Sequence, residues 1–397
     1  MNKLFLTYEV GSLPKISARV KAIRGNEITK RDTDELKGFA NKAGIDVAPI
    51  VDILERQQKE KRQLTPEEKA RVIDINALIN LRLQERSGLD IVYDGEARRT
   101  EMYLHVAQQI DGFENLPEMI RSRGPDSWRA SACIAPPKLK DGSIPGLLDE
   151  FNFVNANASH AIKVPIDDPH MIAIMSDNRY YTELLGEKHK GQPRKLRYEA
   201  KLAFTLALAK NVIRPQVESL VRNEATWIQL DAPAATLDIE HIQILIEGIN
   251  AVVEGIDGVR FSLHICYPRR ISLTDKNGYE LLFPHLLNLD HRVTHLSLEL
   301  ANADEYAKDL APFAQHQSER RFEIGLGAVN ITLEQQERGV IETPELVRNR
   351  ILTATEILGD PKLVYPAPDC GLRQVTLERA IQLYEILVEG AELARKG

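Results

Sequence analysis

The chain has 397 residues, of which 43% are hydrophobic and 27% charged, and a net charge of −7. This composition is typical of globular proteins and excludes fibrous or low-complexity ones. It has no basic stripe of the kind that follows a phosphate backbone, no run of 18 apolar residues and no secretory leader, so we expect a cytoplasmic protein with neither nucleic acid nor a membrane as partner.

Strand and helix patterns alternate along the chain. Short apolar runs bounded by turn residues predict eight strands, at residues 3–10, 89–93, 128–134, 161–166, 226–231, 260–266, 293–298 and 322–326. Helical patterns cover residues 15–88, 198–223, 239–254 and 377–395. Residues 365–373 are predicted to be irregular.

This alternation predicts parallel strands joined by crossover helices, and eight such strands fit a (β/α)8 TIM barrel, an α/β fold. We therefore predict a single domain over residues 1–397, in which residues 15–88 form a helical insertion after the first strand. A doubly wound open sheet is the alternative. Barrel enzymes build their sites at the carboxyl ends of the strands, and polar residues end several of the predicted strands: Glu96, Asp231, His264, Cys266 and Glu299.

The three cysteines of the chain cannot form a disulfide framework, so each must be a core residue, a ligand or a nucleophile. His264 and Cys266 stand two positions apart on one strand, so their side chains point to the same side and can bind one metal ion. Glu299 and Cys370, the latter in a rigid Pro-rich segment, complete a set of one nitrogen, two sulfurs and one oxygen. Such a set favours zinc, and its origin in separate segments at a barrel rim is typical of a catalytic site.

The charge of this ligand set indicates a reaction. Two thiolates and one carboxylate outweigh the two positive charges of zinc, so the ion is a weak Lewis acid that can still hold an electron-rich thiolate. It can bind an incoming thiol and lower the pKa of that thiol, which stays nucleophilic at neutral pH. Glu299 is the weak ligand that can step aside for the thiol, which gives it a catalytic role. The predicted reaction is S-alkylation.

Several motifs of the chain resemble those of the catalytic, C-terminal barrel of cobalamin-independent methionine synthases. In chain order they are Val10-Gly11-Ser12, Asp94-Gly95-Glu96, Ile228-Gln229-Leu230-Asp231, His264-Ile265-Cys266-Tyr267, Leu298-Glu299, Ile324-Gly325-Leu326-Gly327 and Pro368-Asp369-Cys370-Gly371-Leu372. The resemblance implies a zinc-dependent methyltransferase that methylates homocysteine to methionine. It also implies zinc ligands at His264, Cys266, Glu299 and Cys370, and homocysteine contacts at Val10, Gly11 and Ser12 for the carboxylate and at Glu96 and Asp231 for the ammonium.

The chain departs from the methylfolate enzymes of this family at the positions that serve the folate. An Arg, a Trp, a Glu and the proton-donating His of those enzymes correspond here to Ala132, Met175, Leu237 and Thr332. Expelling the amine of a tetrahydrofolate needs a proton, whereas cob(I)alamin leaves without one. The sequence therefore resembles the short core methionine synthases, which lack the N-terminal barrel. We predict methylcobalamin as methyl donor, either free or carried by a corrinoid protein as partner.

Three alternatives remain open. The first is a methylfolate-dependent homocysteine methyltransferase with an altered pteridine pocket. The second is another zinc thiol alkyltransferase, such as a coenzyme M methyl- or alkyltransferase, against which Glu96 and Asp231 argue because its thiol has no ammonium. The third is a zinc-stabilised barrel without catalysis.

Overall fold

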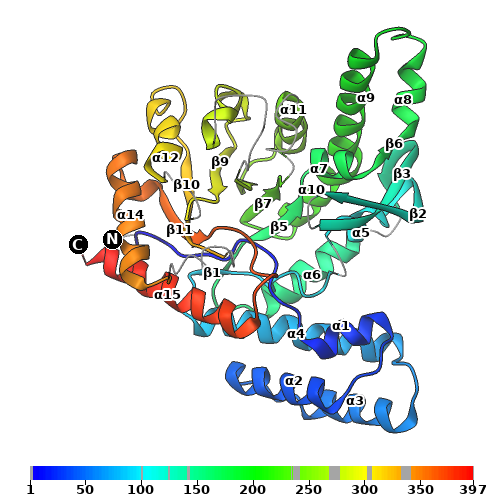
Figure 1. Cartoon of the computed structure of the whole chain (residues 1–397), viewed down its shortest axis with the longest axis vertical. Helices are drawn as coiled ribbons and strands as arrows, with labels where there is room; N and C mark the ends of the chain where they lie inside the picture. Colours follow the sequence, from blue (N-terminus) through cyan, green and yellow to red (C-terminus); the bar gives the residue numbers. More distant parts are fainter. Residues whose placement is uncertain are drawn as a thin grey trace.

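The computed structural model describes residues 3–99, 102–123, 126–140, 144–233, 235, 242–267, 278–301, 306–331 and 341–396. Its centre is a set of parallel strands, with helices on the outside (Figure 1). The largest hydrophobic core lies between these strands and the helices that cover them. Within the described part of the chain, no helix is both long and apolar enough to cross a membrane.

Six strands form one parallel sheet, in the order β11-β10-β9-β8-β7-β5. These strands are β5 (Val164–Asp167), β7 (Trp227–Asp231), β8 (Arg260–Ile265), β9 (Val293–Leu298), β10 (Glu323–Val329) and β11 (Val364–Pro368). A separate parallel pair joins β1 (Ile91–Val92) to β4 (Ala161–Ile162), which runs into β5 through Lys163. All the carboxyl ends in the six-stranded sheet therefore meet along one rim, where the predicted site residues fall.

The amino-terminal segment lies between the two edges of this arrangement. Tyr8 forms a parallel bridge with Ile91, and its backbone N–H donates to the carbonyl of Pro366 in β11 at 3.2 Å. On the other side, the N–H of Lys163 donates to the carbonyl of Val92 at 3.3 Å. The predicted α/β fold of the TIM-barrel type is confirmed. Closure into one eight-stranded sheet stays a prediction, because the strands pair as two sheets and a bridge.

Helices follow the strands and also form an extension. They are α1 (Ser17–Arg24), α2 (Lys30–Ala43), α3 (Ala48–Glu60), α4 (Pro66–Arg86), α5 (Met102–Ala107), α6 (Ile144–Asn157), α7 (Pro169–Met175), α8 (Arg179–Gly186), α9 (Pro193–Leu208), α10 (Arg214–Arg222), α11 (Ile242–Val253), α12 (Tyr306–Gln315), α14 (Pro344–Leu358) and α15 (Leu377–Arg395). The range predicted as one helix at 198–223 is α9, a π-helical turn at Ala209–Ile213 and α10.

Residues 15–88 contain the helices α1 to α4, with α2 and α3 at the lower end of the molecule in Figure 1. The start of α4 is fixed by a capping box, in which the Thr65 side chain accepts from the Glu68 N–H and Glu68 accepts from the Thr65 N–H. This segment has a hydrophobic cluster of its own, which includes Leu54 and Ile79 and reaches the main body at Leu377 of α15.

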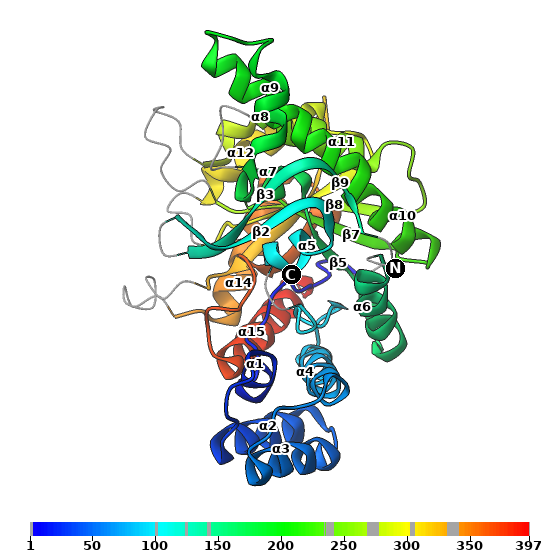
Figure 2. The same cartoon turned by 90° about the vertical axis from the view of Figure 1, so that its right-hand side faces the viewer.

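The strand predicted at 3–10 is present only as the bridge at Tyr8, and two further predictions along the chain were wrong. The third predicted strand, at 128–134, lies in β3 (Asp126–Leu139), which pairs antiparallel with β2 (Ile110–Arg123) and parallel with β6 (Asp177–Asn178). This three-stranded sheet is separate from the six-stranded one: it lies to the right of it in Figure 1 and in front of it in Figure 2. The last strand, β11, was instead predicted to be irregular, because Pro366 and Pro368 have no N–H to donate to a neighbouring strand. Their carbonyls can still accept, as that of Pro366 does from Tyr8.

Candidate metal centre

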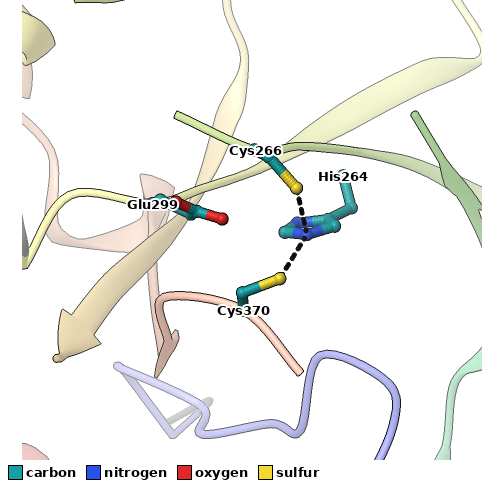
Figure 3. A group of neighbouring side chains, drawn as sticks. All are labelled: His264, Cys266, Glu299 and Cys370. Carbon is teal, nitrogen blue, oxygen red and sulfur yellow. Dashed lines mark hydrogen bonds between the residues drawn. The ribbon is translucent and has the colours of Figure 1, made fainter. Parts of the chain in front are cut away.

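Four potential ligands converge at the carboxyl ends of β8, β9 and β11, the last two of which lie on either side of β10. His264 is the last residue but one of β8 and Cys266 lies just beyond that strand, Glu299 follows β9, and Cys370 follows β11. One ligand atom from each lies within 4.8 Å of all the others, and the Nε2 atom of His264 lies 3.5 Å from the Cys370 Sγ and 3.8 Å from the Cys266 Sγ (Figure 3). The structure therefore brings together all four predicted metal ligands.

The imidazole of His264 is held in the orientation that a metal ligand needs. Its Nδ1 atom lies 3.2 Å from the backbone carbonyl of Ser297, which can only accept, so Nδ1 carries the proton and Nε2 faces the two sulfurs. The Ser297 hydroxyl in turn accepts from the Tyr8 hydroxyl at 2.8 Å. A partner of this kind on the second ring nitrogen is typical of metal-binding histidines.

Two further side chains fix the backbone beside Glu299 and Cys370. The Tyr279 hydroxyl accepts from the Glu299 N–H at 2.8 Å and donates to the carbonyl of Ile265 at 3.0 Å. The carboxylate of Asp369 accepts from the N–H groups of Leu300 and Ala301, both at 2.8 Å. Because Asp369 and Leu300 directly adjoin the two ligands, these bonds set the separation of β9 and β11 at the site.

When no metal is bound, burial and the contacts among the four side chains shift their pKa values. Burial alone would lower the pKa of His264, but its contact with Cys370 raises that pKa to about 9. The pKa of Cys370 lies well below its usual value because its sulfur accepts hydrogen bonds from Cys266 and His264, and the same Cys266–Cys370 bond raises the pKa of Cys266. Burial raises the pKa of Glu299 to about 8. A metal must displace protons here, so its affinity should rise with pH.

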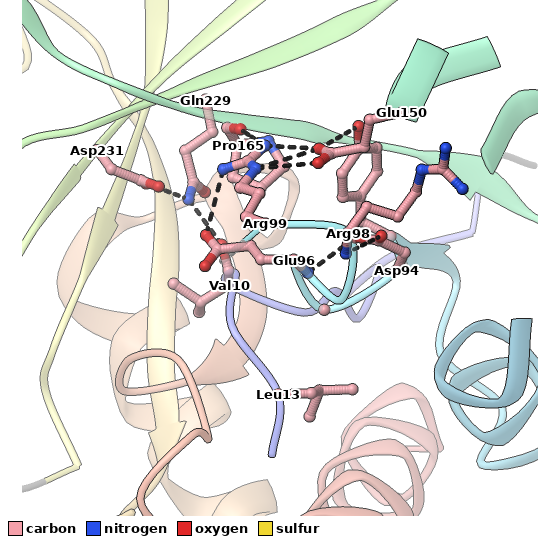
Figure 4. A network of polar contacts seen from close by, with 12 residues as sticks. Val10, Leu13, Asp94, Glu96, Arg98, Arg99, Glu150, Pro165, Gln229 and Asp231 are labelled. Atoms are coloured by element: carbon pink, nitrogen blue, oxygen red, sulfur yellow. Dashed lines mark hydrogen bonds and ion pairs between the residues drawn. The ribbon is translucent and has the colours of Figure 1, made fainter. Parts of the chain in front are cut away.

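Asp231 lies directly beside the metal ligands. It pairs in register with His264 on the neighbouring strand, and its Oδ1 accepts from the Gln229 Nε2 at 2.7 Å (Figure 4). The same Nε2 donates to the carbonyl of Val10, also at 2.7 Å. Burial raises the pKa of Asp231 to about 6, so its carboxylate is charged at neutral pH.

The segment Val10 to Ser12 runs between Glu96 and the bend at residues 369–371, which we call the Cys370 turn. A Cβ added at Gly11 would lie 3.3 Å from the Glu96 Oε1, and one added at Gly371 would lie 2.6 Å from the Ser12 Oγ. The two glycines therefore allow this segment to approach both Glu96 and the residue next to Cys370. All the residues predicted to contact homocysteine thus lie around the metal ligands.

Glu96 is held in an uncommon conformation. Its φ of +57° lies in the left-handed region, which costs a residue with a side chain about 1–3 kcal/mol, and its N–H donates to the Asp94 Oδ1 at 2.7 Å. Arg99 lies 3.5 Å from the Glu96 Oε1 and is paired at 2.7 Å with the buried Glu150. The arginine therefore orients the Glu96 carboxylate, while its charge is largely balanced by Glu150.

Sequence reasoning gave no role to three buried polar residues beside this site. Asp167 pairs in register with Asp231, Lys163 donates to Gln229 and to Val10, and Glu9 lies on the strand-like segment before Val10. Glu9 and Lys163 are ionisable residues inside apolar strand patterns and Asp167 ends one, which is the signal that could have found them.

Glu9 gives the protein a testable dependence on pH. It is fully buried, neither carboxylate oxygen has a hydrogen-bond partner among the described residues, and burial raises its pKa from 4.5 to about 8. The folded state therefore keeps a proton that the unfolded state loses, so this group lowers stability by up to about 1.4 kcal/mol per pH unit as pH rises from about 4.5 to 8.

Glu9→Gln should remove this contribution, so the variant should gain stability relative to the unmodified protein as pH rises through that window. Urea unfolding of both proteins at pH 5, 6, 7 and 8 measures the difference. A difference that stays constant across these values would contradict the raised pKa.

Of the four residues that suggested a corrinoid donor, the structure describes Ala132 and Met175, which lie near one another, since Ala132 pairs with Asp177, two residues after Met175. Ala132 is buried in β3 and Met175 ends α7, with its carbonyl accepting from the Trp128 indole at 3.0 Å. Leu237 and Thr332 lie outside the described residues.

A family model described as "Cobalamin-independent synthase, Catalytic domain" matches residues 52–144 and 191–393. This match corrects the prediction of methylcobalamin as donor and of a corrinoid protein as partner, and it favours the methylfolate alternative. The corrinoid prediction rested on side chains that are missing at a few positions. Such absences do not decide the donor, because a pteridine can be held by groups elsewhere on the rim.

Relatives and solved structures agree with this family. The chain is 31% identical to the methionine synthase of Thermococcus kodakarensis over 317 residues, covering 80% of this chain and 81% of the relative. It is 30% identical to that of Thermoplasma acidophilum over 312 residues, covering 74% and 80%. A B12-independent methionine synthase from Shewanella sp. W3-18-1, solved in complex with selenomethionine, shares the fold with a TM-score of 0.70 and 19% identity over 99% of this chain and 98% of that one. From the family match and the identity to these relatives, the chain belongs to the family of cobalamin-independent methionine synthases, whose catalytic domain it matches.

Proposed function

We propose that the protein transfers a methyl group from a methylfolate to the sulfur of homocysteine and so forms methionine. The observation that carries this proposal is the position of Asp231, a buried carboxylate in register with His264 of the four-ligand cluster. An acceptor with both a thiol and an ammonium can use both groups at once. The methionine synthase relatives support the same reaction.

The four converging residues fit zinc. One imidazole nitrogen, two sulfurs and one carboxylate oxygen within 4.8 Å of one another are a donor set that zinc accepts, and His264 is already oriented by Ser297. When bound, zinc supplies the positive charge that lowers the pKa of an incoming thiol. Glu299 is the one carboxylate of the set, and its side chain is the one that we expect to give way to the thiol.

The rest of homocysteine would be held by two parts of the site. The backbone of Val10 to Ser12 is proposed to meet the carboxylate, and Glu96 and Asp231 are proposed to hold the ammonium. Their support is the packing of this segment between Glu96 and the Cys370 turn. Two anionic side chains do not suit a sulfonate thiol without an ammonium, which argues against coenzyme M as acceptor.

One proton leaves the acceptor and one is taken up by the leaving group in this reaction. The sulfur loses the thiol proton and gains the methyl carbon, while the carbon–nitrogen bond of the methylfolate breaks and the leaving amine takes up a proton. An acid is therefore required near the donor nitrogen. A corrinoid donor would have no such requirement.

A donor comparison tests this proposal. The purified, zinc-loaded protein should form methionine from homocysteine with methyltetrahydrofolate, carrying one or several glutamates, and should do so faster than with free methylcobalamin at equal concentration. Isotope-labelled donor and mass detection of methionine measure both rates. If methionine formed with methylcobalamin and not with methyltetrahydrofolate, the proposed donor would be wrong and the proposed acceptor would stand. If methionine formed with neither donor, the proposed acceptor would be wrong.

A further inference from the structure

Lys163 is a fully buried lysine at the junction of β4 and β5, beneath the proposed homocysteine site. Its ammonium donates to the Val10 carbonyl at 3.2 Å and to the Gln229 Oε1, and it lies 4.4 Å from the centre of the Tyr8 ring. Burying an ammonium costs free energy unless it is well paired. A lysine kept here therefore needs the oxygen atoms that surround it.

The contact with Gln229 decides which way its side-chain amide faces. A lysine ammonium can only donate hydrogen bonds, so the amide must present its oxygen to Lys163. The Nε2 group then faces the opposite way, where it donates to the Asp231 Oδ1 and to the Val10 carbonyl, both at 2.7 Å. With the amide turned over, its oxygen would face the Asp231 carboxylate, and two acceptors would repel one another.

The Val10 carbonyl accepts from both Lys163 and Gln229. These two residues therefore join the segment proposed for the homocysteine carboxylate to the carboxylate proposed for its ammonium. The hydrogen bonds at the predicted metal ligands are different ones: the Ser297 carbonyl accepts from His264, and the Tyr279 hydroxyl accepts from the backbone N–H of Glu299.

We propose that Lys163 is a positioning residue for the amino-acid part of the acceptor, because it sets the direction of the Gln229 amide and thereby places Asp231 and Val10. This inference rests on the proposed function and deepens it, since it names the residue that selects a thiol carrying an α-amino acid group over a plain thiol. In this role Lys163 acts through its bonds to Gln229 and Val10.

The test uses Lys163→Met, which keeps the length of the side chain and removes the donor. The zinc-loaded variant should show a KM for homocysteine at least about tenfold higher than the unmodified protein, since it loses a charge-assisted bond. Its zinc content, its KM for the methyl donor and its methylation of propane-1-thiol, which has neither ammonium nor carboxylate, should stay within about twofold. A merely structural lysine would change all of these quantities together.

Gln229→Met should raise the KM for homocysteine by a similar factor. The double variant should be no worse than the more impaired single variant, because both changes act on the same bond to Asp231. Gln229→Met also tests the inference if Lys163→Met does not fold. Additive effects in the double variant would overturn the claim that the lysine acts through the amide.

Lys15→Met is the matched control. Lys15 is a second lysine close to Glu96, but it donates to the carbonyls of Leu13 and Gly95 and not to Gln229. It should raise the KM for homocysteine less than Lys163→Met does. An equal rise in KM for the two variants would overturn the inference in favour of a general charge effect. The inference would also be overturned if the unmodified protein methylated homocysteine and Lys163→Met left the KM for homocysteine unchanged. If the unmodified protein did not methylate homocysteine, both the proposed function and this inference would be overturned.

Discussion

Replacing Cys370 with serine should empty the metal centre. Hydrogen bonds from Cys266 and His264 lower the pKa of Cys370 and so favour the thiolate that zinc binds, whereas a serine hydroxyl stays protonated and is a poor zinc ligand. Because mutation of a residue that merely supports a ligand lowers metal affinity by about 10–100-fold, loss of a ligand itself should exceed about 100-fold. Zinc measured by mass spectrometry after dialysis against a weak chelator should fall from about one ion per chain to almost none.

Cys266→Ser should give the same result, and Cys133 supplies a matched control. Cys133 is buried in β3, and its thiol donates to the carbonyl of Ala135 at 3.3 Å, apart from the four-ligand cluster. Cys133→Ser makes the same chemical change and should keep its zinc. Full retention of zinc in both Cys266→Ser and Cys370→Ser would show that the ligands are assigned wrongly.

Asp231→Asn should weaken homocysteine binding without releasing zinc. The substitution removes the charge that is proposed to face the ammonium but keeps the shape of the side chain, and a charge-assisted hydrogen bond is worth about 1.5–3 kcal/mol. The Kd for homocysteine should therefore rise by about 10- to 100-fold. Glu96→Gln should act in the same direction. Calorimetric titration of the zinc-loaded proteins measures both values.

Asp32→Asn is the control for loss of a buried carboxylate. Asp32 lies in α2, in the helical extension, and accepts from Lys21 at 2.7 Å. Its substitution should leave homocysteine affinity unchanged. If neither Asp231→Asn nor Glu96→Gln changed the affinity, homocysteine would not be the thiol that this site selects.

The sequence predicted that side chains of the site lie together wherever this followed from the two-residue periodicity of a strand or from the alignment of parallel strand ends. The two-residue spacing places His264 and Cys266 on one side of β8, and the polar ends of consecutive parallel strands place Asp231 and Glu299 beside them. The approach of Val10 to Ser12 to the Cys370 turn followed only from the family resemblance. Its physical basis is the bonding of Tyr8 to β11, which no local pattern reveals.

What the sequence did not predict depends on partners that are distant in the chain. The apolar pattern at 128–134 marks a strand correctly, but it does not say which sheet the strand joins, and here it joins the β2 hairpin. The prolines of β11 hide a strand whose neighbours need only its carbonyls at those positions. Lysine is a residue type that usually lies at the surface, and the burial of Lys163 is explained only by the arrangement of Val10 and Gln229 around its ammonium.

The bonding of the amino-terminal segment also sets the order in which the site forms during synthesis. Tyr8 bonds to β11, and the Arg395 guanidinium of α15 donates to the carbonyls of Leu4 and Phe5, both at 2.8 Å. Val10 to Ser12 are made before β11 and α15, so the contacts that join the amino-terminal segment to these two elements form after the contacts to Ile91 have become possible. A nascent chain that ends before β11 lacks the predicted ligand Cys370 and leaves one edge of β10, and the Tyr8 segment, without the partner that β11 provides. Such intermediates expose strand edges that are prone to aggregation, so the predicted metal centre can be complete only after β11 and Cys370 have been added.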